Sequence, residues 1–339
     1  MKPTVVVTGG TGYIGSHTAV ELLNEGYSVI LIDNLSNSEK WIANRIEQIT
    51  GKKVSLHIFD ICDKEKLRNL FSSTTNIKAV INFAASKAVG ESVQIPLQYY
   101  RNNIVSLLNI LEVMNEFSIP NIVFSSSCTV YGQPEILPVT EQSPILKALS
   151  PYGNTKQICE AIITDNIAVN RTMKSILLRY FNPLGAHPSA LIGELPQGVP
   201  NNLVPFITQT AKGKRKELMV FGNDYNTIDG SCIRDYIDVV DLAKAHVIAV
   251  NRLLNHKTEN DIEIFNLGTG NGVSVIEIIE AFEKASGIKI PYKIVERRAG
   301  DIEKVWADTS KANNILGWKA SVPLIETLRS AWNWEKSLE

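Results

Sequence analysis

Residues 4–15 read TVVVTGGTGYIG, in which a β-branched run leads directly into a glycine-rich turn. The run Thr4–Thr8 is short and apolar, as a buried parallel strand requires. The turn contains both Gly10-x-Gly12-x-x-Gly15 and the wider Gly9-x-x-Gly12-x-x-Gly15. Glycines here permit a tight turn and a close approach to a pyrophosphate, which then rests on the amino end of a helix expected over residues 12–25. The segment therefore predicts a dinucleotide-binding unit.

The next segments repeat a strand–helix alternation. A second strand, expected over residues 28–32, ends in Asp33, and an acid about 20 residues beyond the glycines is placed to accept hydrogen bonds from an adenosine ribose. Its carboxylate would repel a 2′-phosphate, which favours NAD over NADP. Further strands are expected over residues 54–59, 79–83, 121–126 and 175–180, with a long helix over 97–117. Right-handed βαβ steps then give an α/β fold with a doubly wound parallel Rossmann sheet.

The chain changes character after Tyr180. Residues 181–205 are rich in Pro, Gly and Asn, which predicts a loop-built substrate region. A helix over residues 238–254 and a strand over 262–267 return to the sheet, and a further strand is expected near 290–294. We therefore expect two domains. The NAD-binding Rossmann domain comprises residues 1–181 plus 238–267, and a smaller, discontinuous α/β substrate-binding domain comprises 182–237 plus 268–339.

Composition narrows the partners. Hydrophobic residues make up 44% of the 339 positions, enough for a folded core, and the net charge of −1 offers no bulk attraction to nucleic acid or to an anionic membrane. The four cysteines are scattered and the five histidines lack ligand spacing, so we expect neither a disulfide framework nor a metal site. A strand almost directly after Met1, and no long apolar run, predict a cytoplasmic protein.

Two polar segments point to chemistry at the carboxyl edge of the sheet. One is Ser125-Ser126-Ser127, at the end of an expected strand, where open parallel sheets bind ligands. The other is the segment 150–156, SPYGNTK, in which a serine cap and a proline predict a helix start. Tyr152 and Lys156 then share one helix face, and an ammonium beside a phenol favours the phenolate. Alone, this spacing is more typical of a surface pair than of a catalytic one.

Together these segments resemble the extended short-chain dehydrogenase/reductases, most closely the UDP-glucose (UDP-galactose) 4-epimerases. The similarity extends over nearly the whole chain, because matching words recur in the same order. They are KAVGES at 87–92, RYFNP at 179–183, GAHPS at 185–189, PNNL at 200–203, FGNDY at 221–225 and WAD at 306–308.

The resemblance implies a redox route to inversion at C4 of a hexose. A base removes the 4-hydroxyl proton while hydride leaves C4 for tightly bound NAD, and the 4-keto sugar turns over before hydride returns to its other face. Tyr152 is the expected base. Lys156 would lower its pKa by roughly 1–3 units, and the positive nicotinamide ring would lower it further. Ser127 would share a hydrogen bond with the 4-oxygen, and Lys156 would also bond the nicotinamide ribose.

The same resemblance implies further binding residues. Asn182, Asn202 and Phe221 match positions that hold the nucleotide sugar, with Ser127 and Tyr152. Arg234 and Arg298 match a diphosphate clamp, and Asp301 a uridine-ribose contact. The implied cofactor contacts are Gly9, Gly12, Tyr13, Ile14, Gly15, Asp33, Asn34, Asn37, Ser38, Asp60, Ile61, Phe83, Ala84, Lys87, Asn102, Tyr152, Lys156 and Tyr180. Two alternatives stay open: Tyr180 as a core aromatic and Asp60 as a helix cap.

Val305 marks a departure from part of the family. Some members carry a bulky tyrosine there, against the C2 side of the sugar. Valine leaves more room, so we hypothesise that UDP-GlcNAc and UDP-GalNAc are accepted too. The alternative is a packing valine, with another wall closing the pocket.

Two other functions are considered, a dehydratase or decarboxylase and a non-catalytic regulator, together with assembly into a dimer. A dehydratase or decarboxylase of the same superfamily would place acids just after the catalytic serine, where this chain has Cys128 and Thr129. A non-catalytic NAD-binding regulator would typically lack the tyrosine or the lysine. A homodimer is expected through the two helices near 97–117 and 152–170. The apolar residues suggested for this pairing are Leu107, Leu111, Ile158 and Ile162, which could instead pack on their own sheet.

Overall fold

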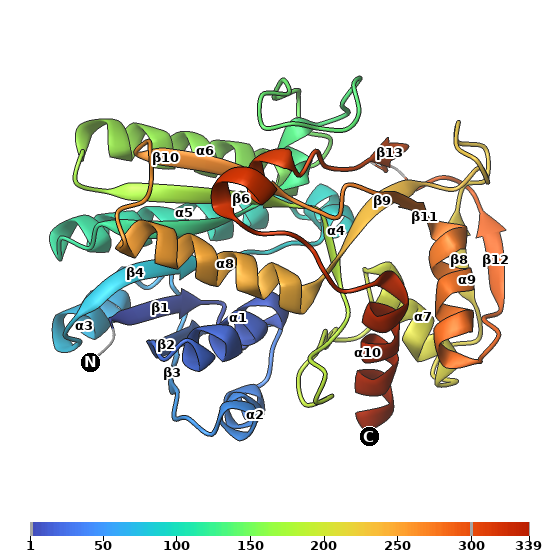
Figure 1. Cartoon of the computed structure of the whole chain (residues 1–339), viewed down its shortest axis with the longest axis horizontal. Coiled ribbons are helices and arrows are strands. Elements are labelled where there is room, and N and C mark those ends of the chain that lie inside the picture. The colour runs from blue at the N-terminus through green and yellow to red at the C-terminus, as the bar shows by residue number, and fades with distance from the viewer. Residues whose placement is uncertain (1–2, 299–300, 339) are drawn as a thin grey trace.

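A seven-stranded parallel sheet forms the centre of the molecule (Figure 1). The computed structural model describes residues 3–298 and 301–338. The strand order is β10-β6-β5-β4-β1-β2-β3, so the chain starts in the middle and winds outward in both directions. The strands are β1 (Thr4–Thr8), β2 (Ser28–Asp33), β3 (Ser55–Ile58), β4 (Ile77–Asn82), β5 (Asn121–Ser127), β6 (Lys174–Tyr180) and β10 (Ile262–Leu267). The predicted α/β class with a parallel, doubly wound sheet is confirmed.

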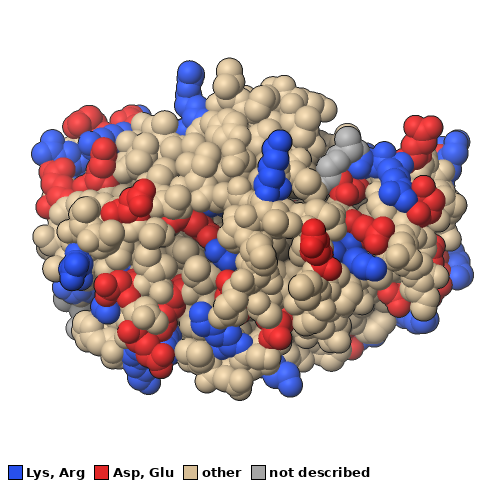
Figure 2. Space-filling model, turned by 90° about the horizontal axis from the view of Figure 1, so that it is seen from above, with Lys and Arg blue, Asp and Glu red and all other residues tan. Residues whose placement is uncertain are grey.

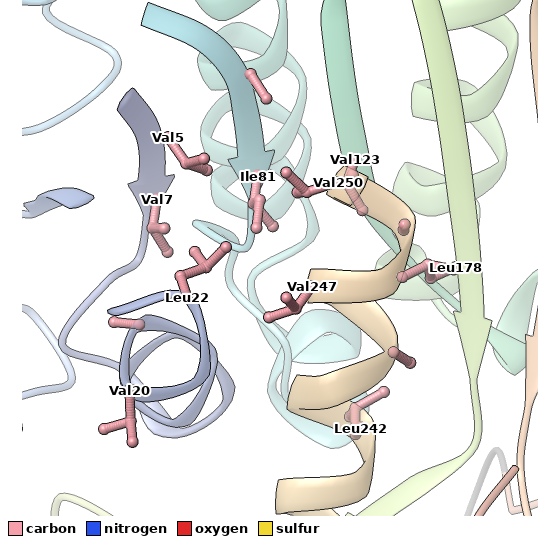
Figure 3. Packing of buried hydrophobic residues seen from close by; sticks show 14 of the residues in the cluster. Val5, Val7, Val20, Leu22, Ile81, Val123, Leu178, Leu242, Val247 and Val250 are labelled. Atoms are coloured by element: carbon pink, nitrogen blue, oxygen red, sulfur yellow. The ribbon is translucent and has the colours of Figure 1, made fainter. Parts of the chain in front are cut away.

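Helices cover both faces of this sheet. One face carries α1 (Tyr13–Asn24), α2 (Trp41–Thr50) and α8 (Val239–Leu254), whose apolar side chains share a core cluster with alternate residues of the strands. Figure 3 shows Leu22 of α1 and Val247 of α8 against Val7 and Ile81. The other face carries α3 (Lys64–Ser73), α5 (Pro96–Glu116) and α6 (Pro151–Val169) over a second cluster. Burial on both faces explains why the strands read as continuous apolar runs.

A smaller lobe lies beyond the carboxyl edge of the sheet. Its four-stranded sheet contains β7 (Asn182–Leu184), β9 (Ile233–Asp238), β11 (Gly272–Ser274) and β13 (Lys304–Val305), and β8 (Leu218–Phe221) pairs separately with β12 (Tyr292–Val295). The helices α7 (Leu203–Ala211), α9 (Val275–Ser286) and α10 (Leu324–Ser337) enclose a third core cluster. The remaining helical pieces are α4 (Val89–Gln94), a 3₁₀ turn at Cys128–Tyr131 and a π turn at Ala312–Leu316.

The structure corrects two expectations. Residues 181–205 are not all loop, because β7 pairs with β9 and α7 begins at Leu203, with Pro205 tolerated in its first turn, where backbone N–H groups need no helical partner. Leu107 and Leu111 are 0% and 3% exposed and pack in the core of their own sheet, so they are not available to a second subunit.

On the face shown in Figure 2, basic and acidic side chains are interspersed, and none of the charged groups forms a large area of one sign. None of the helices in the described ranges combines the length and the apolarity that crossing a bilayer requires.

Candidate active site

Ser127, Tyr152 and Lys156 meet where β5 ends beside the start of α6. Ser150 caps α6 by accepting from the Gly153 backbone N–H at 3.1 Å, and Pro151 follows it in the first helical turn. This start turns Tyr152 and Lys156 toward the sheet, where they are 9% and 4% exposed. The Lys156 Nζ donates to the Ser125 carbonyl at 2.6 Å and lies 5.8 Å from the centre of the Tyr152 ring.

Burial dominates the pKa values of both Tyr152 and Lys156. Burial raises the pKa of Tyr152 above its ordinary value, Tyr180 adds to the rise, and a hydrogen bond with Ser127 opposes it. Burial lowers the pKa of Lys156 to about 8, against the pull of Cys159 and Glu160. Desolvation of the phenolate therefore dominates the pKa of Tyr152 in the chain without a ligand, and Lys156 alone leaves the phenol protonated. A phenolate near neutral pH needs a further positive charge beside Tyr152.

The glycine turn leaves no room for side chains. A Cβ on Gly15 would lie 2.2 Å from the Gly9 carbonyl oxygen, and Gly9 itself has a φ of +66° with Ala84 close by. Gly12 caps α1 without a side-chain hydrogen bond, so the N–H groups of the first turn have no side-chain partner at that cap. The turn has the features of a pyrophosphate cradle on a helix N-terminus.

Asp33 anchors this turn from the end of β2. One carboxylate oxygen accepts from the Thr11 backbone at 3.1 Å, and the other accepts from the Leu35 backbone and the Ser38 hydroxyl, both at 2.9 Å. The predicted residues Asp33 and Ser38 are thus brought together beside the glycines.

Other residues expected to contact a cofactor surround the same edge. The Asn34 amide donates to Asp60 at 3.1 Å, and Asp60 also accepts from the Cys62 backbone at 2.8 Å. The capping alternative for Asp60 is wrong, because the N-cap of the following helix α3 is Asp63. The Asn102 amide donates to the Ser86 hydroxyl at 3.2 Å. The Tyr180 hydroxyl contacts the Ser125 hydroxyl and the ring is buried, so Tyr180 is both a core aromatic and a neighbour of the carboxyl end of β5.

The remaining expected cofactor positions adjoin these groups. Phe83 follows β4 and donates its backbone N–H to Thr8 at 3.2 Å, and the Tyr13 hydroxyl donates to the Gly185 carbonyl at 2.7 Å. The other positions follow the same strands: Ile14 lies in the first turn of α1, after β1, and Asn37, Ile61 and Ala84 lie after β2, β3 and β4.

The smaller lobe contributes a cluster of basic side chains. The Arg298 Nη2 lies 2.7 Å from an Asp301 carboxylate oxygen, and the Arg234 Nη2 lies 4.0 Å from the same atom. The Arg298 guanidinium also sits 5.5 Å from the centre of the Phe221 ring. Four residues expected to bind substrate are therefore neighbours, and the fork of each arginine suits a diphosphate.

Val305 lies in a buried wall between the two parts of the site. It pairs with Arg234 across β13 and β9 and is 2% exposed. Its apolar cluster includes Cys128 and Phe181, the residues that follow Ser127 and Tyr180. Val305 therefore has a packing role, and it lies next to the residues that follow β5 and β6.

Glu194 is a site residue that the sequence analysis missed. One of its carboxylate oxygens lies 3.2 Å from the Lys87 Nζ and accepts from the Asn202 amide at 2.6 Å. It thus joins an expected cofactor contact to an expected substrate contact. The sequence contains one signal for Glu194: no other Asp, Glu, Lys or Arg occurs within residues 181–205, the expected substrate region.

A Rossmann sheet with a serine, a tyrosine and a lysine at its carboxyl edge defines an extended short-chain dehydrogenase/reductase. The family model for GDP-mannose 4,6 dehydratase matches residues 6–331. UDP-glucose 4-epimerase of Bacillus subtilis (strain 168) is 50% identical over 98% of this chain and 97% of its own length.

Solved structures agree with this assignment. UDP-glucose 4-epimerase from Bifidobacterium longum, in complex with NAD+ and UDP, has a TM-score of 0.95 and 47% identity, covering 99% of this chain and 98% of that one. The enzyme of Stenotrophomonas maltophila, with bound NAD and formylated UDP-arabinopyranose, has the same TM-score and coverages at 45% identity. The chain belongs to the NAD-dependent epimerase/dehydratase family and, within it, to the UDP-glucose 4-epimerases.

Proposed function

We propose that this chain interconverts UDP-glucose and UDP-galactose by inverting C4 of the hexose. The observation that supports this function most strongly is the meeting of Ser127, Tyr152 and Lys156 beside the glycine turn, opposite the Arg234 and Arg298 cluster. NAD, when bound, accepts the hydrogen of C4 with its electron pair and later returns it.

The chain's own residues would hold NAD in a definite way. The uncapped start of α1 and the closely packed glycines fit a pyrophosphate, and the Asp33 side of the turn fits an adenosine ribose. Lys156 and Tyr180, at the other end of the edge, would face the nicotinamide half. The positive nicotinamide ring of bound NAD would lower the pKa of Tyr152, which burial alone raises.

Tyr152 and Ser127 would handle the proton of the 4-hydroxyl. The Tyr152 Oη takes the proton as C4 is oxidised and gives it back after the sugar has turned, while the Ser127 hydroxyl donates to the 4-oxygen. Lys156, fixed to the Ser125 carbonyl, keeps positive charge beside the phenolate. Arg234 and Arg298 would grip the diphosphate, so that the hexose turns while the nucleotide stays in place.

A dehydratase is disfavoured by the residue after Ser127. That reaction needs a carboxylate to accept the C5 proton, and the buried Cys128 thiol there, with its pKa raised to about 12, stays protonated. Thr129, which donates to the Ser127 oxygen at 3.0 Å, carries no carboxylate either.

The Val305 position leads us to propose N-acetylated substrates as well. Valine at this wall leaves more space beside the sugar than tyrosine would, and its neighbours Cys128 and Ala307 are small. UDP-GlcNAc and UDP-GalNAc are therefore proposed as additional substrates.

We further propose two domains, a homodimer and a cytoplasmic location. The seven strands of the main sheet lie within residues 1–181 and 238–267, which supports the expected two-domain division. Leu97 and Leu108 of α5 are 80% and 39% exposed, which supports a homodimer through this helix, with Ile158 and Ile162 of α6 partly buried. We place the protein in the cytoplasm.

One incubation tests the proposal. The purified chain, given UDP-galactose and no added cofactor, should form UDP-glucose until the two sugars reach equilibrium. A 4-keto-6-deoxy product would indicate a dehydratase, and recovery of unchanged UDP-galactose from protein loaded with NAD would favour the non-catalytic regulator.

A further inference from the structure

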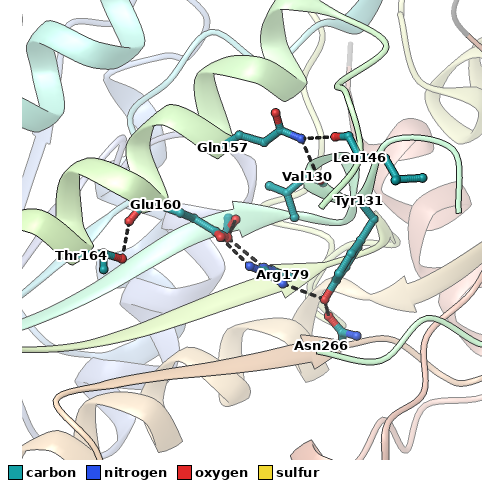
Figure 4. A network of polar contacts seen from close by, with 9 residues as sticks. Val130, Tyr131, Leu146, Gln157, Glu160, Thr164, Arg179 and Asn266 are labelled. Carbon is teal, nitrogen blue, oxygen red and sulfur yellow. Dashed lines mark hydrogen bonds and ion pairs between the residues drawn. The ribbon is translucent and has the colours of Figure 1, made fainter. Parts of the chain in front are cut away.

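A buried polar network is centred on Glu160 of α6 and Arg179 of β6 (Figure 4). Glu160 accepts two hydrogen bonds from Arg179, at 2.9 Å from Nε and 2.6 Å from Nη2, and a third from the Ser126 hydroxyl at 2.5 Å. The Arg179 and Glu160 side chains are only 4% and 12% exposed. Bidentate pairing of this kind fixes geometry as well as charge.

Each member of this network is covalently next to, or one helical turn from, a group of the site. Ser126 precedes Ser127, Arg179 precedes Tyr180, and Glu160 follows Lys156 by four residues on the same face of α6. The network therefore joins β5, β6 and α6, the three elements whose relative position sets the distances among the reacting groups.

The network also reaches the wall on the sugar side. Arg179 Nη1 donates to the Tyr131 hydroxyl at 3.0 Å, and that hydroxyl donates to the Asn266 amide oxygen at 2.6 Å. Asn266 in turn donates to the Val139 carbonyl at 2.9 Å, and the backbone of Val139 pairs with Trp306, next to Val305. Tyr131 itself closes the 3₁₀ turn that begins after Ser127.

We propose that Ser126, Glu160 and Arg179 are positioning residues for the reaction described above. In this role they hold Ser127 against the face of α6 that carries Tyr152 and Lys156. The ion pair with Arg179 also neutralises the charge of Glu160, which lies one helical turn from Lys156. The inference rests on the proposed function. None of the three needs to touch substrate or cofactor.

The balance between the charges of Glu160 and Arg179 matters because few ionisable groups face Tyr152 and Lys156. Around Tyr152 these are Lys156 on its own helix, Tyr99 of α5, Cys128 after β5 and Tyr180 of β6, and around Lys156 they are Cys159 and Glu160. Arg179 covers both Glu160 oxygens, so the pair presents little net charge to the site. Removing one partner exposes the charge of the other in a place where water screens poorly.

The positional test uses Ser126→Ala with Thr164→Ala as its matched control. Ser126→Ala removes one hydrogen bond to Glu160 and leaves the ion pair, whereas Thr164 donates at 2.8 Å to the backbone carbonyl of the same Glu160, on the exposed side of α6. For Ser126→Ala we expect kcat to fall about tenfold, with KM for UDP-galactose and NAD content unchanged. Thr164→Ala should match wild type. Wild-type kcat in Ser126→Ala would overturn the positioning role.

The charge test compares Glu160→Gln, Arg179→Gln and the double variant by pH–rate profile. An exposed Arg179 lowers the pKa of both Tyr152 and Lys156, so both limbs of the Glu160→Gln profile should move to lower pH, by about half a pH unit. An exposed Glu160 should move both limbs of Arg179→Gln to higher pH, and the double variant should restore them. Shifts in the same direction for both single variants, or none, would overturn the charge balance.

Stability is controlled separately. Tyr131→Phe removes the buried hydroxyl between Arg179 and Asn266, so it should lower the unfolding temperature and yet show a smaller fall in kcat than Ser126→Ala. If thermal unfolding temperature alone tracked kcat across all variants, Thr164→Ala included, the network would be structural and the proposal wrong. Turnover of UDP-galactose by the wild-type protein, measured in parallel, tests the proposed function independently of the comparison between variants.

Discussion

Tyr152 sits at the start of α6 with its ring 9% exposed, and its surroundings in the protein alone favour the neutral phenol. Its usefulness as a base thus depends on neighbouring positive charge. Lys156 supplies part of it, although burial brings the pKa of that lysine down to about 8.

Lys156→Met should therefore show a pH dependence with a definite sign. Without the ammonium the pKa of Tyr152 in the complex rises, and because the base acts only when deprotonated, the acid limb of kcat moves to higher pH. Near neutral pH we expect a loss of about 100-fold or more, partly recovered as pH increases. A pH–rate profile checks this, and an acid limb left at the wild-type position would contradict it.

Val305→Tyr should separate the two substrate classes. A phenol ring in the buried wall takes the space that an N-acetyl group would need, so turnover of UDP-GlcNAc should fall at least about tenfold while UDP-glucose is affected much less. Val305→Ala is the control and should keep both activities. Parallel loss of both substrates in the tyrosine variant would indicate a damaged core instead.

Among the elements, the β1–α1 connection has the least tolerance for change. Gly15→Ala places a methyl group 2.2 Å from the Gly9 carbonyl oxygen, so the turn must open. We expect purified protein with little bound NAD and an overpacking cost of about 1–3 kcal/mol. Gly90→Ala, where a Cβ meets nothing within 4 Å, should retain NAD. Cofactor content after denaturation is the measurement, and full occupancy in Gly15→Ala would contradict the cradle.

The elements also show which parts of the fold a sequence can predict. The run 4–33 signals its own strand, turn, helix and strand because each signal is local, and Ser150-Pro151 marks the start of α6 in the same way. The pairing of β7 and β13 with β9 could not be predicted, because strands of two or three residues carry no period and their partners are distant in sequence.

The candidate site divides in the same way. Ser127, Tyr152 and Lys156 could be found from spacing and resemblance, while Glu194 required the lobes to be folded together before its contacts with Lys87 and Asn202 appeared. The raised pKa of Tyr152 depends on burial, which the spacing of two residues on a helix does not reveal.

For the molecule as a whole, the exposed leucines of α5 predict assembly. Leu108→Glu should place a charge in the proposed dimer interface and give a monomer by light scattering at micromolar concentration. Ile228→Glu, at an 89% exposed position in the smaller lobe, should leave the dimer intact. A wild-type chain that is strictly monomeric would contradict the proposed dimer.

Conversion of UDP-galactose by Tyr152→Phe, with its NAD content measured in the same preparation, tests the proposed chemistry most directly. The phenylalanine ring fills the same space, so NAD and UDP should still bind, and the rate should fall by about 10³-fold because no group remains at the 4-oxygen to take the proton. A variant that keeps its cofactor and converts the sugar at the wild-type rate would show that Tyr152 is not the base.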